Sequence, residues 1–173
     1  MKIIPTLLDM EICIAKMFDS RQNIIVPNIS WGFGVHECDL LIIKPSGYAI
    51  EVEIKRSKSD LLADKKKGHN HESTKISELY YALPECLMDS CMEHIPLTAG
   101  VISVKYYESR SWWSAAIIRP AMTHKRTKLT DEQIQKVSRL GVMRIWTLKS
   151  TLVSLMKDNK ALKEKLMDTI TKP

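Results

Sequence analysis

Acidic and basic side chains alternate with aliphatic ones in the stretch GYAIEVEIKRSKSD, residues 47–60. In a β-strand, side chains two positions apart share a face, so Glu53 and Lys55 would lie on one face and Val52 and Ile54 on the other. Carboxylates bind hard metal cations, and an ammonium group stabilises developing negative charge. The stretch therefore predicts a strand that is apolar on one face and equipped for chemistry on the other.

Three acid-x-Lys strings occur in the 173-residue sequence, where about two are expected by chance. The strings in 64–66 and 158–160 fall in segments that predict helices, where residues two apart do not face each other. Glu53 and Lys55 lie instead in a predicted strand. A further acid, Asp39, precedes them at the head of the neighbouring apolar segment CDLLII. Asp39, Glu53 and Lys55, on two neighbouring predicted strands, are therefore the candidate site.

Glu11 is a separate candidate, because it lies in the middle of the apolar face of the first predicted helix, near Ile14 and Phe18. An unpaired carboxylate buried there would be strongly unfavourable. It must be paired, protonated, hydrogen-bonded or directed into a polar site.

The hydrophobic pattern predicts an α/β fold with a mixed sheet. A helix is followed by three strands, and the turn sequence KPSG between the last two predicts an antiparallel meander. A short basic helix, a second helix, two more strands and C-terminal helices follow. The predicted helices cover about 6–20, 59–67, 73–83, 130–140 and 148–169; the predicted strands cover 23–28, 38–43, 48–54 and the sequences AGVISVKYY and WWSAAIIRP.

At these residues the chain resembles the PD-(D/E)xK nuclease superfamily, whose restriction-endonuclease-like core is a helix, an antiparallel three-strand meander, another helix and further strands. The resemblance covers roughly residues 6–104. Asp39 would match the first acid of the motif, Glu53 the second and Lys55 its lysine. Glu11 would match the acid that many members carry on the first helix.

The stretch EIKRSKSDLLADKKK also resembles the one that follows the lysine in bacterial and phage members linked to DNA repair or resolvase-like activity. Cys38 stands where the motif has a proline before its first acid, so the matching motif is short. A non-catalytic nucleic-acid-binding or assembly module on the same fold is the alternative reading.

The resemblance implies an enzyme, a nuclease that hydrolyses phosphodiester bonds in DNA with Mg²⁺, for which Mn²⁺ could substitute, and with RNA as the alternative substrate. Asp39 and Glu53 would bind the metal, joined by the backbone carbonyl of Ile54 and, directly or through water, by Glu11. Lys55 would orient the attacking water or stabilise the developing charge.

Strand register provides a test of this site. If KPSG formed a four-residue turn closing at Gly47, Asp39 would sit opposite Val52 and would point away from the face of Glu53. The site therefore requires an odd-length loop or a bulge near Gly47. Glu51 shares the face of Glu53, and the sequence leaves open whether it binds a second metal or pairs with a cation.

Basic residues are concentrated in two segments of this chain of net charge +6. Residues 55–67 hold six Lys/Arg against two Asp, and residues 119–128 hold four Lys/Arg and no acid. Each segment could be a solvated surface or a contact for a polyanion. The candidate nucleic-acid-binding residues are Arg56, Lys58, Lys65, Lys66, Lys67, His69, His71, Lys125, Arg126 and Lys128.

The chain length suits a single domain spanning 1–173, with a core over about 6–128 and C-terminal helices over about 130–169. No apolar run approaches the roughly 20 residues that a membrane-spanning helix needs, and no signal-like segment precedes the first helix. These features predict a cytoplasmic protein without a membrane partner. Four cysteines without a CxxC pair predict reduced thiols.

The last predicted helix carries a heptad pattern, with one asparagine among leucines at alternating spacings of four and three. We call this row the heptad seam; its residues are Leu148, Leu152, Leu155, Asn159, Leu162 and Leu166. Such a row pairs helices in short coiled coils, and it could equally pack on the parent domain. A homodimer through this helix is therefore a hypothesis.

Overall fold

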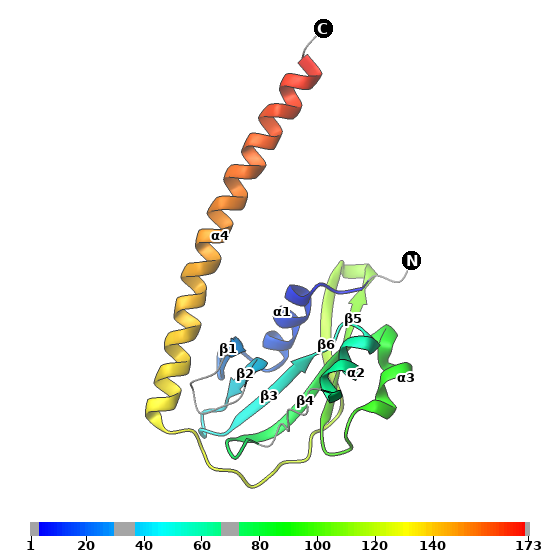
Figure 1. Ribbon diagram of the computed structural model, residues 1–173, viewed down its shortest axis with the longest axis vertical. Coiled ribbons are helices and arrows are strands. Elements are labelled where there is room, and N and C mark those ends of the chain that lie inside the picture. Colours follow the sequence, from blue (N-terminus) through cyan, green and yellow to red (C-terminus); the bar gives the residue numbers. More distant parts are fainter. Residues whose placement is uncertain (1–3, 30–36, 67–72, 172–173) are drawn as a thin grey trace.

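The computed structural model describes residues 4–29, 37–66 and 73–171 (Figure 1). It contains six strands, the first three of them consecutive, and helices of very different length. The elements are α1 (Leu7–Met17), β1 (Ile24–Ile29), β2 (Cys38–Ile43), β3 (Ala49–Ile54), α2 (Lys58–Lys66), β4 (Ile76–Pro84), η1 (Glu85–Leu87), α3 (Met88–Cys91), η2 (Met92–His94), β5 (Gly100–Tyr107), η3 (Glu108–Arg110), β6 (Trp112–Arg119) and α4 (Asp131–Thr171).

The strands form one mixed sheet in the order β1-β2-β3-β4-β5-β6. The first three pair antiparallel, β3, β4 and β5 run parallel, and β6 returns antiparallel to β5. Helix α2 lies in the connection between the parallel strands β3 and β4 (Figure 1). The predicted α/β class, mixed sheet and antiparallel meander are confirmed.

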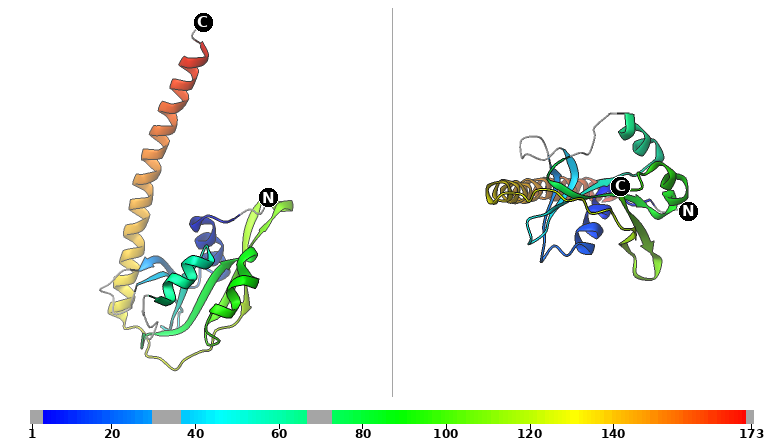
Figure 2. Two further views of the ribbon diagram at one scale, coloured as in Figure 1. Left: turned by 45° about the vertical axis from the view of Figure 1, so that its right-hand side comes forward. Right: turned by 90° about the horizontal axis from the view of Figure 1, so that it is seen from below.

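Helices cover both faces of the sheet (Figure 2). On one face, Met10 and Ile14 of α1 pack in a core cluster with residues from β2 to β5. On the other face, the base of α4 packs through Val137 on β1, β2 and β3, while Leu61 of α2 packs with α3 on β4 and β5. This second face therefore has two apolar clusters with β3 between them.

Local hydrogen bonds set the beginnings of three helices. Thr6 and Asp9 form a reciprocal capping box at α1, and Thr130 and Gln133 form one at α4. The Ser57 hydroxyl accepts from the backbone N–H three residues later at the start of α2. Helix α2 therefore begins at Lys58, one residue before the predicted start, with Ser57 as its cap.

The helix predicted over 73–83 is wrong, because residues 76–84 form strand β4. Tyr80 packs in the cluster beneath α1, and Tyr81 packs in the cluster beneath α2 and α3. A parallel strand that is buried on both faces has no polar alternation, so its hydrophobic pattern does not distinguish it from a buried helix.

The predicted division of the C-terminal region into two helices is also wrong, since α4 runs unbroken through Gly141. A Cβ atom at Gly141 would lie 3.2 Å from a methyl group of Val26, so glycine here allows α4 to approach β1 closely. Beyond this contact α4 leaves the sheet and projects away from it (Figures 1 and 2). Among the described helices, none is long and apolar enough to cross a membrane.

Candidate functional site

The hairpin between β2 and β3 has the odd-length loop that the site requires. The Lys44 N–H donates to the carbonyl of Tyr48 over 2.9 Å, and the Gly47 N–H donates to the carbonyl of Lys44 over 2.8 Å. Residues 45–47 thus form the loop, and Gly47 takes the left-handed conformation at φ 83° that favours glycine. The prediction about loop parity is confirmed.

The resulting register places the two motif acids side by side. Leu40 pairs with Val52, so the next position along β2 brings Asp39 opposite Glu53. The regular pairing ends there, and the Ile54 N–H donates to Oδ2 of Asp39 over 2.7 Å. The Asp39 carboxylate therefore lies at the end of the β2–β3 ladder, held by the backbone of β3.

Glu53 and Lys55 form a buried ion pair at the same end of the sheet. Nζ of Lys55 lies 2.8 Å from Oε2 of Glu53, and each residue is only 6% exposed. Burial raises the pKa of Glu53 to about 7, helped by the negative charge of Asp39, while Lys55 opposes the rise. One lysine therefore does not offset both the desolvation of Glu53 and its repulsion by Asp39.

Further negative charge lies around this pair. Glu51, on the same face of β3, is fully buried and also raises the pKa of Glu53. The buried thiol of Cys38 has a pKa raised by desolvation and then by Glu51, Glu53 and Asp39, in that order. Several carboxylates thus act on one small volume, which favours occupation by a cation.

Glu11 approaches this volume from α1. Burial raises the pKa of its half-buried carboxyl, and the charge of Asp39 raises it further. A hydrogen bond from the Asn28 side chain and the positive charge of Arg144 act in the opposite direction. Asp39 is therefore near enough to act on both Glu11 and Glu53.

Asn28 and Arg144 lie beside Glu11 and were not predicted. Arg144 of α4 donates a hydrogen bond to the backbone carbonyl of Asn28, whose φ of 53° is left-handed. Asparagine adopts the left-handed conformation more readily than most residues, so the residue type at position 28 was the one local feature of the sequence that pointed to this contact. The contact joins residues 116 positions apart, so no local pattern could reveal Arg144.

The donor chemistry of these residues fits Mg²⁺, which prefers carboxylate oxygen. Asp39 and Glu53 are the candidate ligands, while the roles of Glu11 and of the Ile54 carbonyl stay predictions. In the described arrangement, Lys55 is the cation beside Glu53. Among the described residues, no three His, Cys, Asp or Glu side chains already converge as a metal-ligand set.

The first group of candidate nucleic-acid contacts is partly engaged within the protein. The Arg56 Nε–H donates to the carbonyl of Pro5 over 3.1 Å, and Lys58 lies 4.0 Å from Glu93 in an exposed ion pair. Lys65 and Lys66 lie in α2, but their side chains are outside the description. The predicted contacts at Lys67, His69 and His71 lie outside the described residues.

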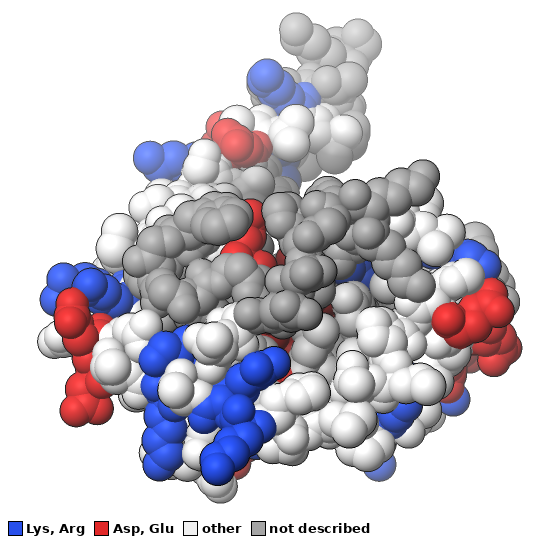
Figure 3. Space-filling view, turned by 60° about the horizontal axis from the view of Figure 1, so that its bottom comes forward, with Lys and Arg blue, Asp and Glu red and all other residues white. Residues whose placement is uncertain are grey.

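The second group lies in the segment that joins β6 to α4. Lys125 and Lys128 are exposed and Arg126 is half-buried. Lys75, at the start of β4, donates to the carbonyl of Lys128 over 3.1 Å, so basic residues from two segments meet here. Figure 3 brings this end of the sheet forward and shows lysine and arginine side chains gathered on it.

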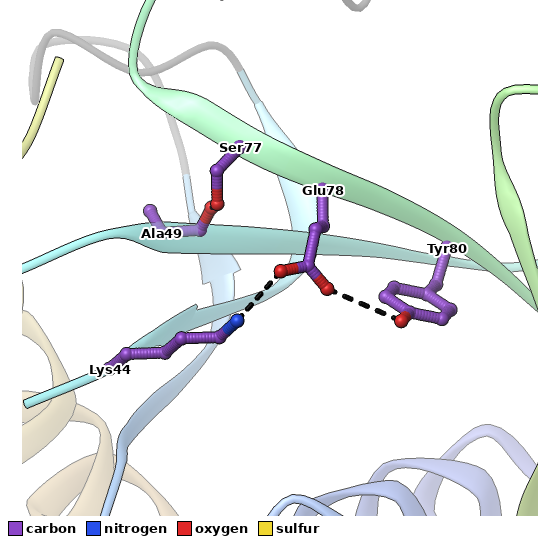
Figure 4. Close-up of polar contacts among 5 residues, drawn as sticks. All are labelled: Lys44, Ala49, Ser77, Glu78 and Tyr80. Carbon is purple, nitrogen blue, oxygen red and sulfur yellow. Dashed lines mark hydrogen bonds and ion pairs between the residues drawn. The ribbon is translucent and has the colours of Figure 1, made fainter. Parts of the chain in front are cut away.

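A second buried polar cluster lies on the opposite face of the sheet, beneath α1 (Figure 4). Nζ of Lys44 lies 2.6 Å from Oε1 of Glu78, and the Tyr80 hydroxyl donates to Oε2 of Glu78 over 3.3 Å. The neighbouring Ser77 hydroxyl donates to the carbonyl of Ala49 over 2.8 Å. Each carboxylate oxygen of Glu78 therefore has a partner.

Comparison with known proteins supports the fold alone. No protein-family model matches the chain, and no curated protein matches it. A solved structure from Silicibacter pomeroyi, a protein of unknown function, aligns with a TM-score of 0.56 at 18% identity. The alignment covers 92% of this chain and 96% of that one. The arrangement of elements therefore occurs in another protein over nearly its full length.

Proposed function

We propose that this protein is a Mg²⁺-dependent nuclease of the PD-(D/E)xK type that acts on DNA. The observation that carries the proposal is the register of the β2–β3 hairpin, which puts Asp39 opposite Glu53 and next to Lys55. The sequence of elements around them is a helix, an antiparallel meander, a helix and a parallel strand. That order is the one that the resemblance to the restriction-endonuclease-like core implies.

In this proposal Asp39 and Glu53 hold the metal, with Glu11 approaching from α1. When bound, Mg²⁺ would neutralise charge on the phosphodiester and lower the pKa of a bound water. Lys55 would then no longer pair with Glu53, which would bind the metal. Its ammonium group would orient the attacking water or stabilise the charge that develops on the phosphate. Apolar packing on both sides of β3 would keep bulk water away from these groups.

The protonation of Glu53 would couple activity to pH. Because its pKa is raised to about 7, Glu53 must release a proton before it can bind a cation. Metal affinity, and cleavage at limiting Mg²⁺, should therefore rise with pH through about 7.

The proposal is tested by incubating the purified chain with Mg²⁺ or Mn²⁺ on single-stranded, duplex and branched DNA and on RNA. Glu53→Ala and Lys55→Ala should lose cleavage, and a chelator should abolish it in the unmodified chain. Glu78→Ala removes a buried glutamate from the opposite face and serves as the matched control. Cleavage that persists in both site variants would refute the assignment.

A non-catalytic nucleic-acid-binding module is the second candidate function. It is favoured by the pairing of Glu53 with Lys55 and of Asp39 with a backbone N–H, which leaves no ready ligand set among the described residues. In that case the protein would bind DNA or RNA equally well with Mg²⁺ or with a chelator, and none of these substrates would be cut.

A further inference from the structure

The outer part of α4 is an apolar helix without a partner in the described chain. Every residue from 145 to 167 is exposed, and the five leucines of the heptad seam are between 57% and 65% exposed. In water, a helix gains most of its stability by packing an apolar face against another element. This row of leucines therefore needs a partner.

The direction in which the heptad seam faces limits how a partner helix can be oriented. Leu148 lies seven residues beyond Gly141, which faces Val26 of β1, so the seam continues the row of α4 that packs on its own domain. A second α4 running parallel would need the base of its helix where β1 already lies. An antiparallel helix avoids this conflict, since its base and its domain would lie beyond the far end of the first helix (Figure 1).

We propose that a second copy of this chain occupies the seam, with the two α4 helices antiparallel about a twofold axis between residues 160 and 161. Leu155 of one copy then packs beside Leu166 of the other, and Asn159 beside Leu162. The pairing is isologous, so each contact occurs twice. It does not depend on the proposed nuclease activity.

Charge and polarity favour this register over its neighbour. Asp158 flanks the seam on the side where it would meet Lys165 of the second copy, so opposite charges pair twice. The two Asn159 side chains would be offset by about 4.5 Å along the helix axis, three residues at 1.5 Å each, and could bond to each other. Moving the pairing one heptad step toward the domains would pair Leu148 with Leu166 and Leu152 with Leu162, but it would also place Asp158 against Asp158, and Lys149 against Lys163.

Self-association is tested by sedimentation equilibrium of the full chain at micromolar concentrations. We expect a dimer, and Leu155→Lys should raise its Kd by at least about 100-fold because it places two charges in the seam. Ser154→Lys, one position away on the outward face, is the matched control and should leave the Kd unchanged. A monomeric unmodified chain, or equal dimerisation of the two variants, would overturn the proposal.

Orientation is tested by charge exchange. Asp158→Lys should weaken the dimer about tenfold, because two opposite-charge pairs become like-charge pairs. Adding Lys165→Asp should restore the Kd, whereas adding Lys163→Asp should not. Restoration by Lys163→Asp instead would indicate parallel helices and would overturn the antiparallel arrangement.

Discussion

Two glutamate–lysine pairs lie on opposite faces of the same sheet, one buried and one with a partly exposed lysine, and they differ in what surrounds them. Glu78 has a lysine on one oxygen and a tyrosine hydroxyl on the other. Glu53 has Lys55 on one side, but Asp39 and Glu51 add negative charge beside it. A glutamate–lysine pair is thus no sign of function by itself; the carboxylates gathered around Glu53 distinguish the candidate site from a structural contact.

The largest expected difference between the two pairs is in the rate of DNA cleavage. Glu53→Gln keeps the shape of the side chain but removes its charge, so Mg²⁺-dependent cleavage of DNA should fall about 1,000-fold. Glu78→Gln should change the initial rate very little. Initial rates at saturating Mg²⁺ provide the measurement, and equal losses in the two variants would place the site elsewhere.

The pH dependence of stability should also differ between the pairs. The pKa of Glu53 rises from 4.5 to about 7 on folding, so the folded state binds its proton more tightly than the unfolded state. The stabilisation that Glu53 contributes is then complete below pH 4.5 and is lost as pH rises from 4.5 to about 7, by about 3 kcal/mol.

Urea unfolding at a series of pH values would measure this slope. Glu53→Gln should remove the loss of stability between pH 4.5 and about 7 that Glu53 causes, and so be more stable than the unmodified chain at the upper end. Glu78→Gln should retain the slope. A Glu53→Gln variant that keeps the full slope would contradict the raised pKa.

Stability should depend more on the Glu78 pair than on the Glu53 pair, which reverses the order expected for cleavage. Glu78→Ala removes the partner of the Tyr80 hydroxyl and leaves that group under α1 without its acceptor, so the free energy of unfolding should fall by about 2 kcal/mol. Cleavage should remain. Chemical denaturation together with the nuclease assay checks both expectations, and a lost activity with unchanged stability would argue against a purely structural role for Glu78.

The smallest effect concerns Tyr80 alone. Tyr80→Phe removes the 3.3 Å hydrogen bond to Glu78 and the hydrogen bond that the hydroxyl makes with the Ala121 backbone, but it keeps the Lys44 pair and the ring, so unfolding should require about 1 kcal/mol less. Thermal melting of Tyr80→Phe and of Glu78→Ala would show how much of the stability of this cluster comes from the tyrosine hydroxyl. A loss as large as that of Glu78→Ala would mean that the ion pair contributes nothing.

The residues that the sequence places correctly are those governed by short-range rules. Asp39, Glu53 and Lys55 belong to one hairpin, where alternation and loop parity determine the face of each side chain. The helix that carries Glu11 has an amphipathic pattern and a capping box. These features follow from neighbouring residues, so they could be predicted before any long-range contact was known.

The errors arise where distant segments decide the structure. Strand β4 is buried by helices on both faces, and α4 passes through Gly141 because Val26 lies against it. Arg144, on the same helix, donates a hydrogen bond to the Asn28 carbonyl, and its charge acts on Glu11. In each case the contact that settles the conformation lies far away in the sequence and leaves no local pattern.

The loop over residues 45–47 also sets which insertions and deletions the candidate site can tolerate. Pro45 and Ser46 are exposed, and the pairing of β2 with β3 begins only beyond them. Residues added there would lengthen the loop and leave Asp39 opposite Glu53, because the strand pairing decides which side chains share a face. A single residue inserted within β2 or β3, between the loop and the acids, would turn one acid away unless a bulge absorbed it. Distant relatives that share the site should therefore differ in length at this loop and not within the two strands.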